Sequence, residues 1–233
     1  CEKSPQRFEV DYRDWNLSYD AYGGGLEVTD RDAALQVAAE GADTVGKRLA
    51  ITVTKTYRNV MGGRLLLATP IDGLNVGVSG YTGTRPVGLT EPRRRVGAVS
   101  AEYTNESWSL RSELSKQTET DVLQRHVVAG YAEVAYSITR GVQVAGLYST
   151  LDTKLRGASA ANLARAPSLL QHDEWGAGFN YWLSDTFVIK TSYHWVDGNR
   201  LASPDQPDIR SAVARGTMGR KTHAMFVSSS LSF

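Results

Sequence analysis

Residues Glu174 to Leu183 read Glu-Trp-Gly-Ala-Gly-Phe-Asn-Tyr-Trp-Leu, and this stretch decides the fold class. Its large or apolar side chains recur at every second position: Trp175, Ala177, Phe179, Tyr181 and Leu183. Successive side chains of a β-strand point to opposite faces, so a strand would place this set on one side, whereas a helix would scatter it. The stretch therefore predicts a strand with one apolar and one polar face. Trp182 is the exception, because it is a large aromatic side chain whose position falls on the polar face.

The same two-residue period recurs along the chain. In residues 187–196, Phe187, Ile189 and Tyr193 alternate with Lys190 and His194. Residues 23–46 are ambiguous between a strand and a helical turn, and Gly23-Gly24-Gly25 indicates a turn or a bulge. We predict clear strands at 47–57, 62–71, 74–83, 94–105, 107–117, 124–138, 141–154, 170–183, 187–198 and 221–233, with weaker ones at 6–13 and 15–22.

Short and long connections alternate between these strands. Short turns are predicted at Asp72-Gly73, Asn105-Glu106, residues 139–141 and Ser184-Asp185, and longer links at 84–93, 118–123, 155–169 and 199–220. Long strands with short turns at one end and long loops at the other are typical of an outer-membrane β-barrel. With the short turns in the periplasm, strand 221–233 descends and strand 47–57 ascends.

Composition excludes several other classes of protein. The chain has 233 residues, a formal net charge of +1, one cysteine and four histidines. This charge gives no case for binding nucleic acid, a disulfide framework is excluded, and no stretch approaches the ~20 apolar residues of a membrane-spanning helix. We expect an N-terminal tether at 1–5 and an all-β, transmembrane, antiparallel up-and-down barrel at 6–233. About 10–12 strands are visible, and the barrel could be whole or part of a larger one.

Several segments carry a family resemblance. Residues 57–65, followed by 70–74 and 79–83, resemble the strand–turn–strand pattern of Gram-negative general and phosphate-selective porins. The resemblance covers residues 47–233 and is to the C-terminal part of such porins, which are usually longer. It implies a location in the outer membrane, contact with its lipid and lipopolysaccharide, and assembly by the barrel-assembly machinery, with Phe233 as the C-terminal signal.

The alternation also assigns an inward set of side chains that would line the lumen. Basic and acidic members of this set are equal in number, so a pore lined by them would select only weakly between cations and anions. The alternative is a barrel whose interior is closed by salt bridges between these side chains. Leu49, Ile51, Val53, Val76, Val78, Ala177, Phe179 and Ile189 are expected to face lipid. The predicted pore-lining residues are Arg48, Arg64, Glu102, Arg111, Glu113, Glu133, Glu174, Lys190 and His194.

Three further features carry hypotheses. Cys1 is the only cysteine, and a first-position cysteine is where a bacterial lipoprotein carries its lipid anchor. Arg93-Arg94-Arg95 would form either a phosphate-attracting mouth or a solvated edge that contacts lipopolysaccharide. Tryptophans and tyrosines near strand ends fit interfacial girdles: Trp15, Trp108, Trp175, Trp195, Tyr136, Tyr148, Tyr181 and Tyr193.

The sequence thus predicts a porin-like channel for passive diffusion of small polar solutes or ions. The alternative is a non-conducting structural barrel, with or without a lipid anchor, that binds a partner protein. Either the channel or the structural barrel could form homo-oligomers. His172-Asp173-Glu174 cannot converge as a whole, because neighbouring strand residues face opposite ways. No spacing singles out a nucleophile, so we expect no enzyme, no metal and no cofactor.

Overall fold

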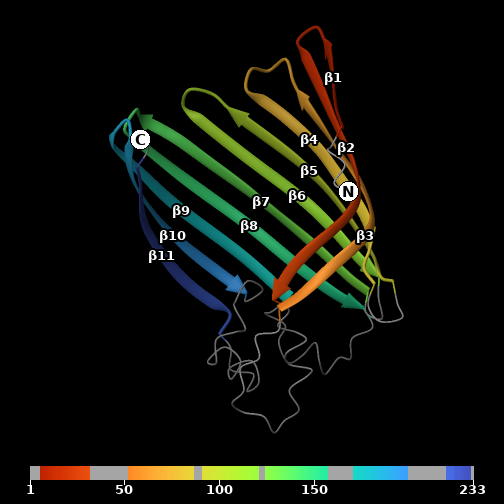
Figure 1. Cartoon of the computed structure of the whole chain (residues 1–233). Coiled ribbons are helices and arrows are strands. Elements are labelled where there is room, and N and C mark those ends of the chain that lie inside the picture. The colour runs from red at the N-terminus through yellow and green to blue at the C-terminus, as the bar shows by residue number, and fades with distance from the viewer. Residues whose placement is uncertain are drawn as a thin grey trace.

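The computed structural model describes residues 6–31, 52–86, 91–120, 124–156, 170–198 and 219–231, and this part of the chain forms one antiparallel sheet of eleven strands (Figure 1). Within it, no helix is long and apolar enough to cross a bilayer. The strands are β1 (Gln6–Tyr12), β2 (Trp15–Arg31), β3 (Thr52–Ala68), β4 (Leu74–Thr84), β5 (Arg93–Thr104), β6 (Trp108–Thr120), β7 (Gln124–Thr139), β8 (Val142–Arg156), β9 (Gln171–Ser184), β10 (Phe187–Gly198) and β11 (Lys221–Leu231).

Each strand pairs with its neighbours in sequence, from β1 at one edge to β11 at the other. Short turns join β1 to β2, β3 to β4, β5 to β6, β7 to β8 and β9 to β10. The predicted all-β, up-and-down architecture and the predicted short turns are confirmed. The described sheet is not closed, because β1 and β11 do not pair with each other.

One prediction about the strands is wrong. Residues 47–57 and 62–71 were expected to be two strands joined by a turn, but residues 52–68 form the single strand β3. The turn-like segment is a β-bulge: the register against β4 shifts between Arg58 and Met61, and Asn59 has a φ of 51°. Asparagine tolerates this left-handed conformation, so the chain bends without reversing. Residues 52–57 therefore run in the same direction as 62–68, towards the short turns, and do not ascend from them.

The ambiguous N-terminal region is partly settled. Strand β2 continues through the glycine triplet to Arg31, and its register against β3 shifts between Gly24 and Leu26. The glycines therefore mark a bulge and not a turn. Cys1, Arg48, Leu49, Ile51 and Phe233 lie outside the described residues.

The pairing register divides the side chains of the sheet into a polar face and an apolar face. Directly paired residues share a face, and the row through Asn75, Glu102, Arg111 and Glu133 defines the polar one. The most buried side chains all belong to this face, which makes it the concave side of the curved sheet in Figure 1. They are Tyr57, Val60, Glu119, Val127, Ala135, Thr153, His172 and Val188.

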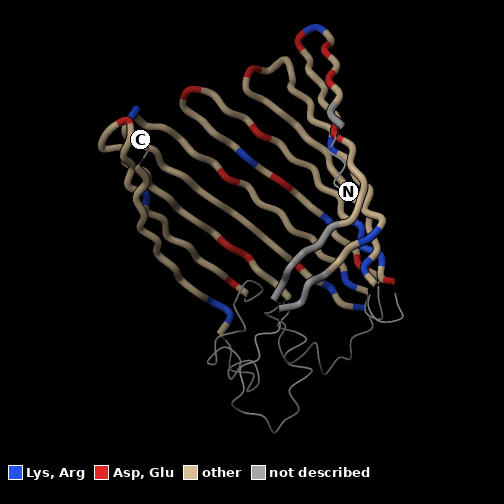
Figure 2. The backbone as a smooth tube through the Cα atoms, in the orientation of Figure 1, with Lys and Arg blue, Asp and Glu red and all other residues tan. Residues whose placement is uncertain are grey.

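The apolar face is exposed to an extent unusual for a soluble protein. Val78, Val99 and Leu114 are each more than half exposed at 56%, 51% and 55%. Its charged side chains gather towards the long-connection ends of the strands, where Figure 2 shows many of the basic residues. A broad apolar band of this kind is stable only against lipid or another apolar surface. Of the expected lipid-facing residues, Val76, Val78, Ala177, Phe179 and Ile189 lie on it, and the side chain of Val53 is outside those described.

Aromatic side chains flank this band. Trp108 and Tyr136 stack near the short turns with ring centroids 4.5 Å apart, and Tyr193 and Trp195 meet edge-on at 5.0 Å towards the other end. The register also places Trp182 on the polar face, as its position in the sequence predicts. The arrangement is the one expected of two interfacial belts.

Candidate functional site

The concave polar face carries the candidate site. Of the predicted pore-lining residues, Arg48 lies outside the described residues, and the other eight share this face. The alternation of side chains along each strand is enough to predict the face on which these eight residues lie. It suffices because no bulge interrupts the alternating stretch around any of them. These residues are Arg64, Glu102, Arg111, Glu113, Glu133, Glu174, Lys190 and His194.

Near the short turns, a row of alternating charge crosses three strands. Arg111 of β6 pairs directly with Glu102 of β5 and Glu133 of β7. One guanidinium nitrogen, Nη2, lies 3.0 Å from Oε1 of Glu133, and the two side chains remain 50% and 35% exposed. An ion pair this accessible contributes at most about 1 kcal/mol to stability, so its charges remain available to solutes.

Near the long connections, Arg94 is fixed by partners that sequence reasoning missed. Its Nη1 donates to the hydroxyl of Tyr57 at 2.8 Å, and its Nη2 donates to Oε1 of Gln117 at 2.9 Å. Its guanidinium carbon lies 5.4 Å and 5.8 Å from the ring centroids of Tyr57 and Tyr81. Arg85 pairs with the buried Glu119 at 3.0 Å in the same region. No periodic signal could have found these partners, since Tyr57 lies two strands from Arg94.

The arginine triplet is divided between the two faces. Arg94 points into the polar face, whereas Arg93 and Arg95 lie on the apolar face, with Nε of Arg93 donating to Oγ1 of Thr82 at 3.1 Å. The two hypotheses for the triplet thus concern different residues. The hypothesis of a mouth therefore concerns Arg94, and the hypothesis of a lipopolysaccharide contact concerns Arg93 and Arg95.

A third cluster joins β9 and β10. Oε1 of Glu174 lies 2.6 Å from Nδ1 of His194, and Oε2 of Glu174 lies 3.0 Å from Nε2 of His172. The other ring nitrogen of His194, Nε2, lies 2.9 Å from Oγ of Ser192. Asp173 points to the opposite face and accepts a hydrogen bond from Thr150 at 2.7 Å.

This cluster refines one prediction. The residues His172, Asp173 and Glu174 do not converge as a whole, as expected, but His172 and Glu174 share a face and are joined by His194 from the next strand. Among the described residues, no group of three histidine, cysteine or acidic side chains is arranged to hold a metal ion.

Charged side chains of both signs lie on the polar face, and the predicted equality of their numbers stays a prediction. Among the residues whose side chains the structure describes, the acids are Glu9, Asp11, Asp20, Glu102, Glu113, Glu119, Glu133 and Glu174, and the bases are Arg64, Arg85, Arg94, Arg111, Arg125 and Lys190.

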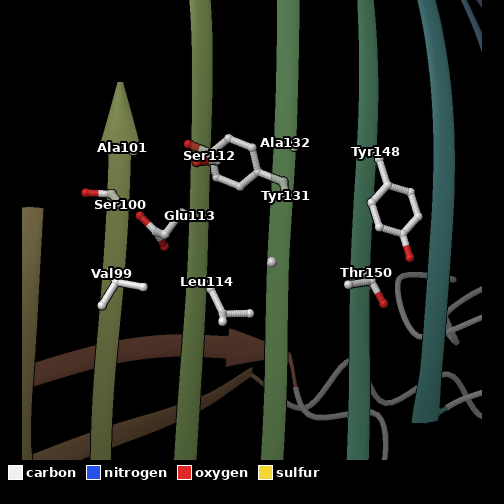
Figure 3. A pocket seen from close by; sticks show the side chains of 11 residues that line it. Val99, Ser100, Ala101, Ser112, Glu113, Leu114, Tyr131, Ala132, Tyr148 and Thr150 are labelled. Atoms are coloured by element: carbon white, nitrogen blue, oxygen red, sulfur yellow. The ribbon is translucent and has the colours of Figure 1, made fainter. Parts of the chain in front are cut away.

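The apolar face is indented at one place over β5 to β8. A shallow hollow of about 390 Å³ opens beside Gly130, which has no side chain to fill it (Figure 3). Small and aliphatic groups from the apolar face line most of it: Val99, Ala101, Ser112, Leu114 and Ala132. The hollow is separate from the polar clusters.

Comparisons with known proteins bear on the fold. No protein-family model and no curated protein sequence matches the chain. Among solved structures, the chain is similar to the anion-selective porin from Comamonas acidovorans, with a TM-score of 0.52 and 11% identity over 82% of this chain. It also matches OmpT, an outer-membrane protein of Vibrio cholerae, with a TM-score of 0.45 and 12% identity, over 83% of this chain and 70% of that one. The chain spans about half the length of the Comamonas porin, 48%.

The expectation that the chain is not an enzyme is not upheld, because the reason given for it is wrong. It rested on finding no spacing that singles out a nucleophile, yet the hydroxyl of Ser192 is hydrogen-bonded to His194, two residues along the same strand. The likeness to the Comamonas porin concerns the fold alone and does not exclude an enzyme. The signal that could have revealed the pair is the spacing Ser-x-His on one strand face.

Taken with the exposed apolar band and the alternating connections, the likeness to the Comamonas porin supports one conclusion about architecture. The chain has the all-β, up-and-down fold of an outer-membrane β-barrel.

Proposed function

We propose that this chain forms part of the wall of a water-filled channel in the outer membrane of a Gram-negative bacterium. Small polar solutes and ions would diffuse passively through this channel. The observation that carries the proposal is the contrast between the two faces. The concave face holds charged side chains of both signs, and the convex face holds exposed aliphatic side chains such as Val78 and Leu114. A sheet built in this way encloses water and faces lipid.

The placement of the charges indicates how such a channel would treat solutes. The Arg94 cluster lies at the long-connection end, and the accessible Arg111–Glu133 pair lies near the short turns. A solute passing along the wall would meet both signs of charge, which favours polar over apolar solutes.

The edges of the sheet bear on how the channel closes. Strands β1 and β11 are both unpaired on one side within the described part of the chain, and the chain spans about half of the similar porin. Unpaired edges in lipid leave backbone groups without hydrogen bonds, which is costly. We therefore infer that the described sheet is one part of a larger wall, completed by further strands or by a second copy.

Conduction is the direct test. The protein, folded in detergent and purified, is added to a planar lipid bilayer, and a heat-denatured sample serves as the control. Stepwise, ohmic increases in current are expected from the folded sample alone. Electrical silence of a folded sample would contradict the channel and would favour a structural barrel, in which the Arg111–Glu133 and Arg85–Glu119 pairs serve only as an internal network.

A further inference from the structure

Ser192, His194 and Glu174 form a continuous line of hydrogen bonds on the polar face. Ser192 and His194 are two residues apart on β10 and so share a face, and Glu174 reaches His194 from β9. Oγ of Ser192 lies 2.9 Å from Nε2 of His194, and Nδ1 of His194 lies 2.6 Å from Oε1 of Glu174. This is the order of groups, hydroxyl to imidazole to carboxylate, that activates a serine nucleophile.

The hydrogen-bond network assigns the direction of each bond. An ionised carboxylate only accepts, so Nδ1 of His194 must donate its proton to Glu174. In the neutral ring, Nε2 is then the unprotonated nitrogen and accepts from the hydroxyl of Ser192. The tautomer fixed by Glu174 is therefore the one in which His194 can act as a base towards Ser192.

The imidazole of His194 is held in place from both neighbouring strands. On β9, a Cβ at Gly176 would lie only 3.2 Å from Nδ1 of His194, so glycine leaves the room that the ring occupies. On β11, the ring of Phe226 meets it edge-on with centroids 5.4 Å apart. The side chain of His194 is 17% exposed and that of Glu174 is 19% exposed, so water has limited access to the bond between them.

The carboxylate of Glu174 is itself anchored. Its second oxygen, Oε2, accepts from Nε2 of His172 at 3.0 Å and from Oγ of Ser149 at 3.4 Å. His172 is 7% exposed, which fixes one side of the carboxylate against the wall. Oε1 of Glu174 therefore remains available to His194. The hydrogen bonds to Oε2 hold the carboxylate that orients the imidazole, as a catalytic base requires.

We propose that Ser192 is the nucleophile of an ester-hydrolysing site on the polar face, with His194 as its general base and acid and Glu174 as the residue that positions His194. The substrate class is a small carboxylic ester that reaches the site along the polar face. Phe226 is 59% exposed beside His194 and offers an apolar surface for the acyl group. Lys190 lies two residues from Ser192 on the same face, where its ammonium can stabilise negative charge on the carbonyl oxygen.

The reaction has two balanced steps. Oγ of Ser192 bonds to the carbonyl carbon while its proton passes to Nε2 of His194; the carbon–oxygen ester bond then breaks, and the leaving alkoxide takes that proton as an alcohol. Water then attacks the acyl-serine and gives a proton to His194. The bond to Oγ breaks, the carboxylic acid is released, and Ser192 regains its proton.

The test uses a fluorophosphonate reagent, which phosphonylates activated serines, on the full chain folded in detergent. Intact mass and peptide mapping are expected to show one phosphonyl group, on Ser192. The Ser192→Ala variant should lose the label. The control is Ser228→Ala, which changes a serine of the same face that pairs with Lys190 and has no histidine partner among the described residues, and it should keep the label. Folding of each variant is checked by its heat-dependent mobility in gel electrophoresis. An unlabelled Ser192 in folded native protein overturns the proposal, whether or not the protein conducts.

A second measurement tests whether Glu174 positions His194 for catalysis or only stabilises the fold. Hydrolysis of p-nitrophenyl butyrate should fall by about 10²- to 10⁴-fold in Glu174→Gln, because an amide no longer holds the required tautomer of His194. Glu174→Asp keeps the charge and should recover part of the rate. Equal rates in native protein, Ser192→Ala and Glu174→Gln would overturn the proposal.

Discussion

Tyr57 and Arg94 are hydrogen-bonded across an intervening strand, with Nη1 of Arg94 2.8 Å from the hydroxyl of Tyr57. Strand β4 contributes Gly83 beside Arg94 at this level, so no side chain obstructs the contact between β3 and β5. The bulge at Arg58–Met61 adjoins Tyr57, and Tyr57 lies on the same face as Arg94. The Arg94 cluster thus depends on a local irregularity of β3 as much as on the arginine.

This dependence predicts a cost for changing Asn59, the residue with a φ of 51° in the bulge. Asn59→Ala should lower the free energy of unfolding by about 1 kcal/mol, because alanine tolerates the left-handed region poorly. Asn59→Gly should be nearly neutral, since glycine adopts it freely. Urea unfolding in detergent, followed by tryptophan fluorescence, measures both, and equal stability of the two variants would contradict this account of the bulge.

The turn between β3 and β4 gives a second prediction. Gly73 has a φ of 77°, and a Cβ there would lie 1.9 Å from the carbonyl oxygen of Thr104. Gly73→Ala should therefore destabilise the protein by about 1–2 kcal/mol or more. Gly97→Ala is the matched control, because nothing lies within 4 Å of the Cβ it would add. Similar thermal unfolding of the two variants would show that this turn can rearrange at little cost.

The two faces predict opposite responses to a new charge. Val78 lies on the apolar face and is 56% exposed, and its neighbour Ser79 lies on the polar face. Val78→Arg should destabilise the folded protein in lipid by about 2–4 kcal/mol, whereas Ser79→Arg should be tolerated. The yield of folded protein in vesicles, read from heat-dependent gel mobility, compares them. A well-folded Val78→Arg variant would mean that this part of the face does not meet the bilayer core.

The faces of the sheet could be predicted from the sequence because the period of two survives wherever strands are regular. It fails at Arg58–Met61, where one extra residue imitates a turn and makes a single strand look like two. The two-residue period also does not predict contacts between residues of different strands. Nothing in the local pattern brings Glu174 to His194 or Tyr57 to Arg94, because those contacts follow from the register between strands and not from alternation within one.

Ion selectivity gives the last prediction. Arg64 and Arg111 both project from the polar face, so replacing both with glutamate should shift the preference of the channel towards cations. The shift is expected because each change reverses a charge in a confined space where salt screens poorly. The variant Arg93→Glu with Arg95→Glu makes the same change of charge on the opposite face and should leave selectivity nearly unaltered. Reversal potentials across a tenfold gradient of potassium chloride measure both variants. An equal shift in the two would mean that the polar face does not line the conducting path.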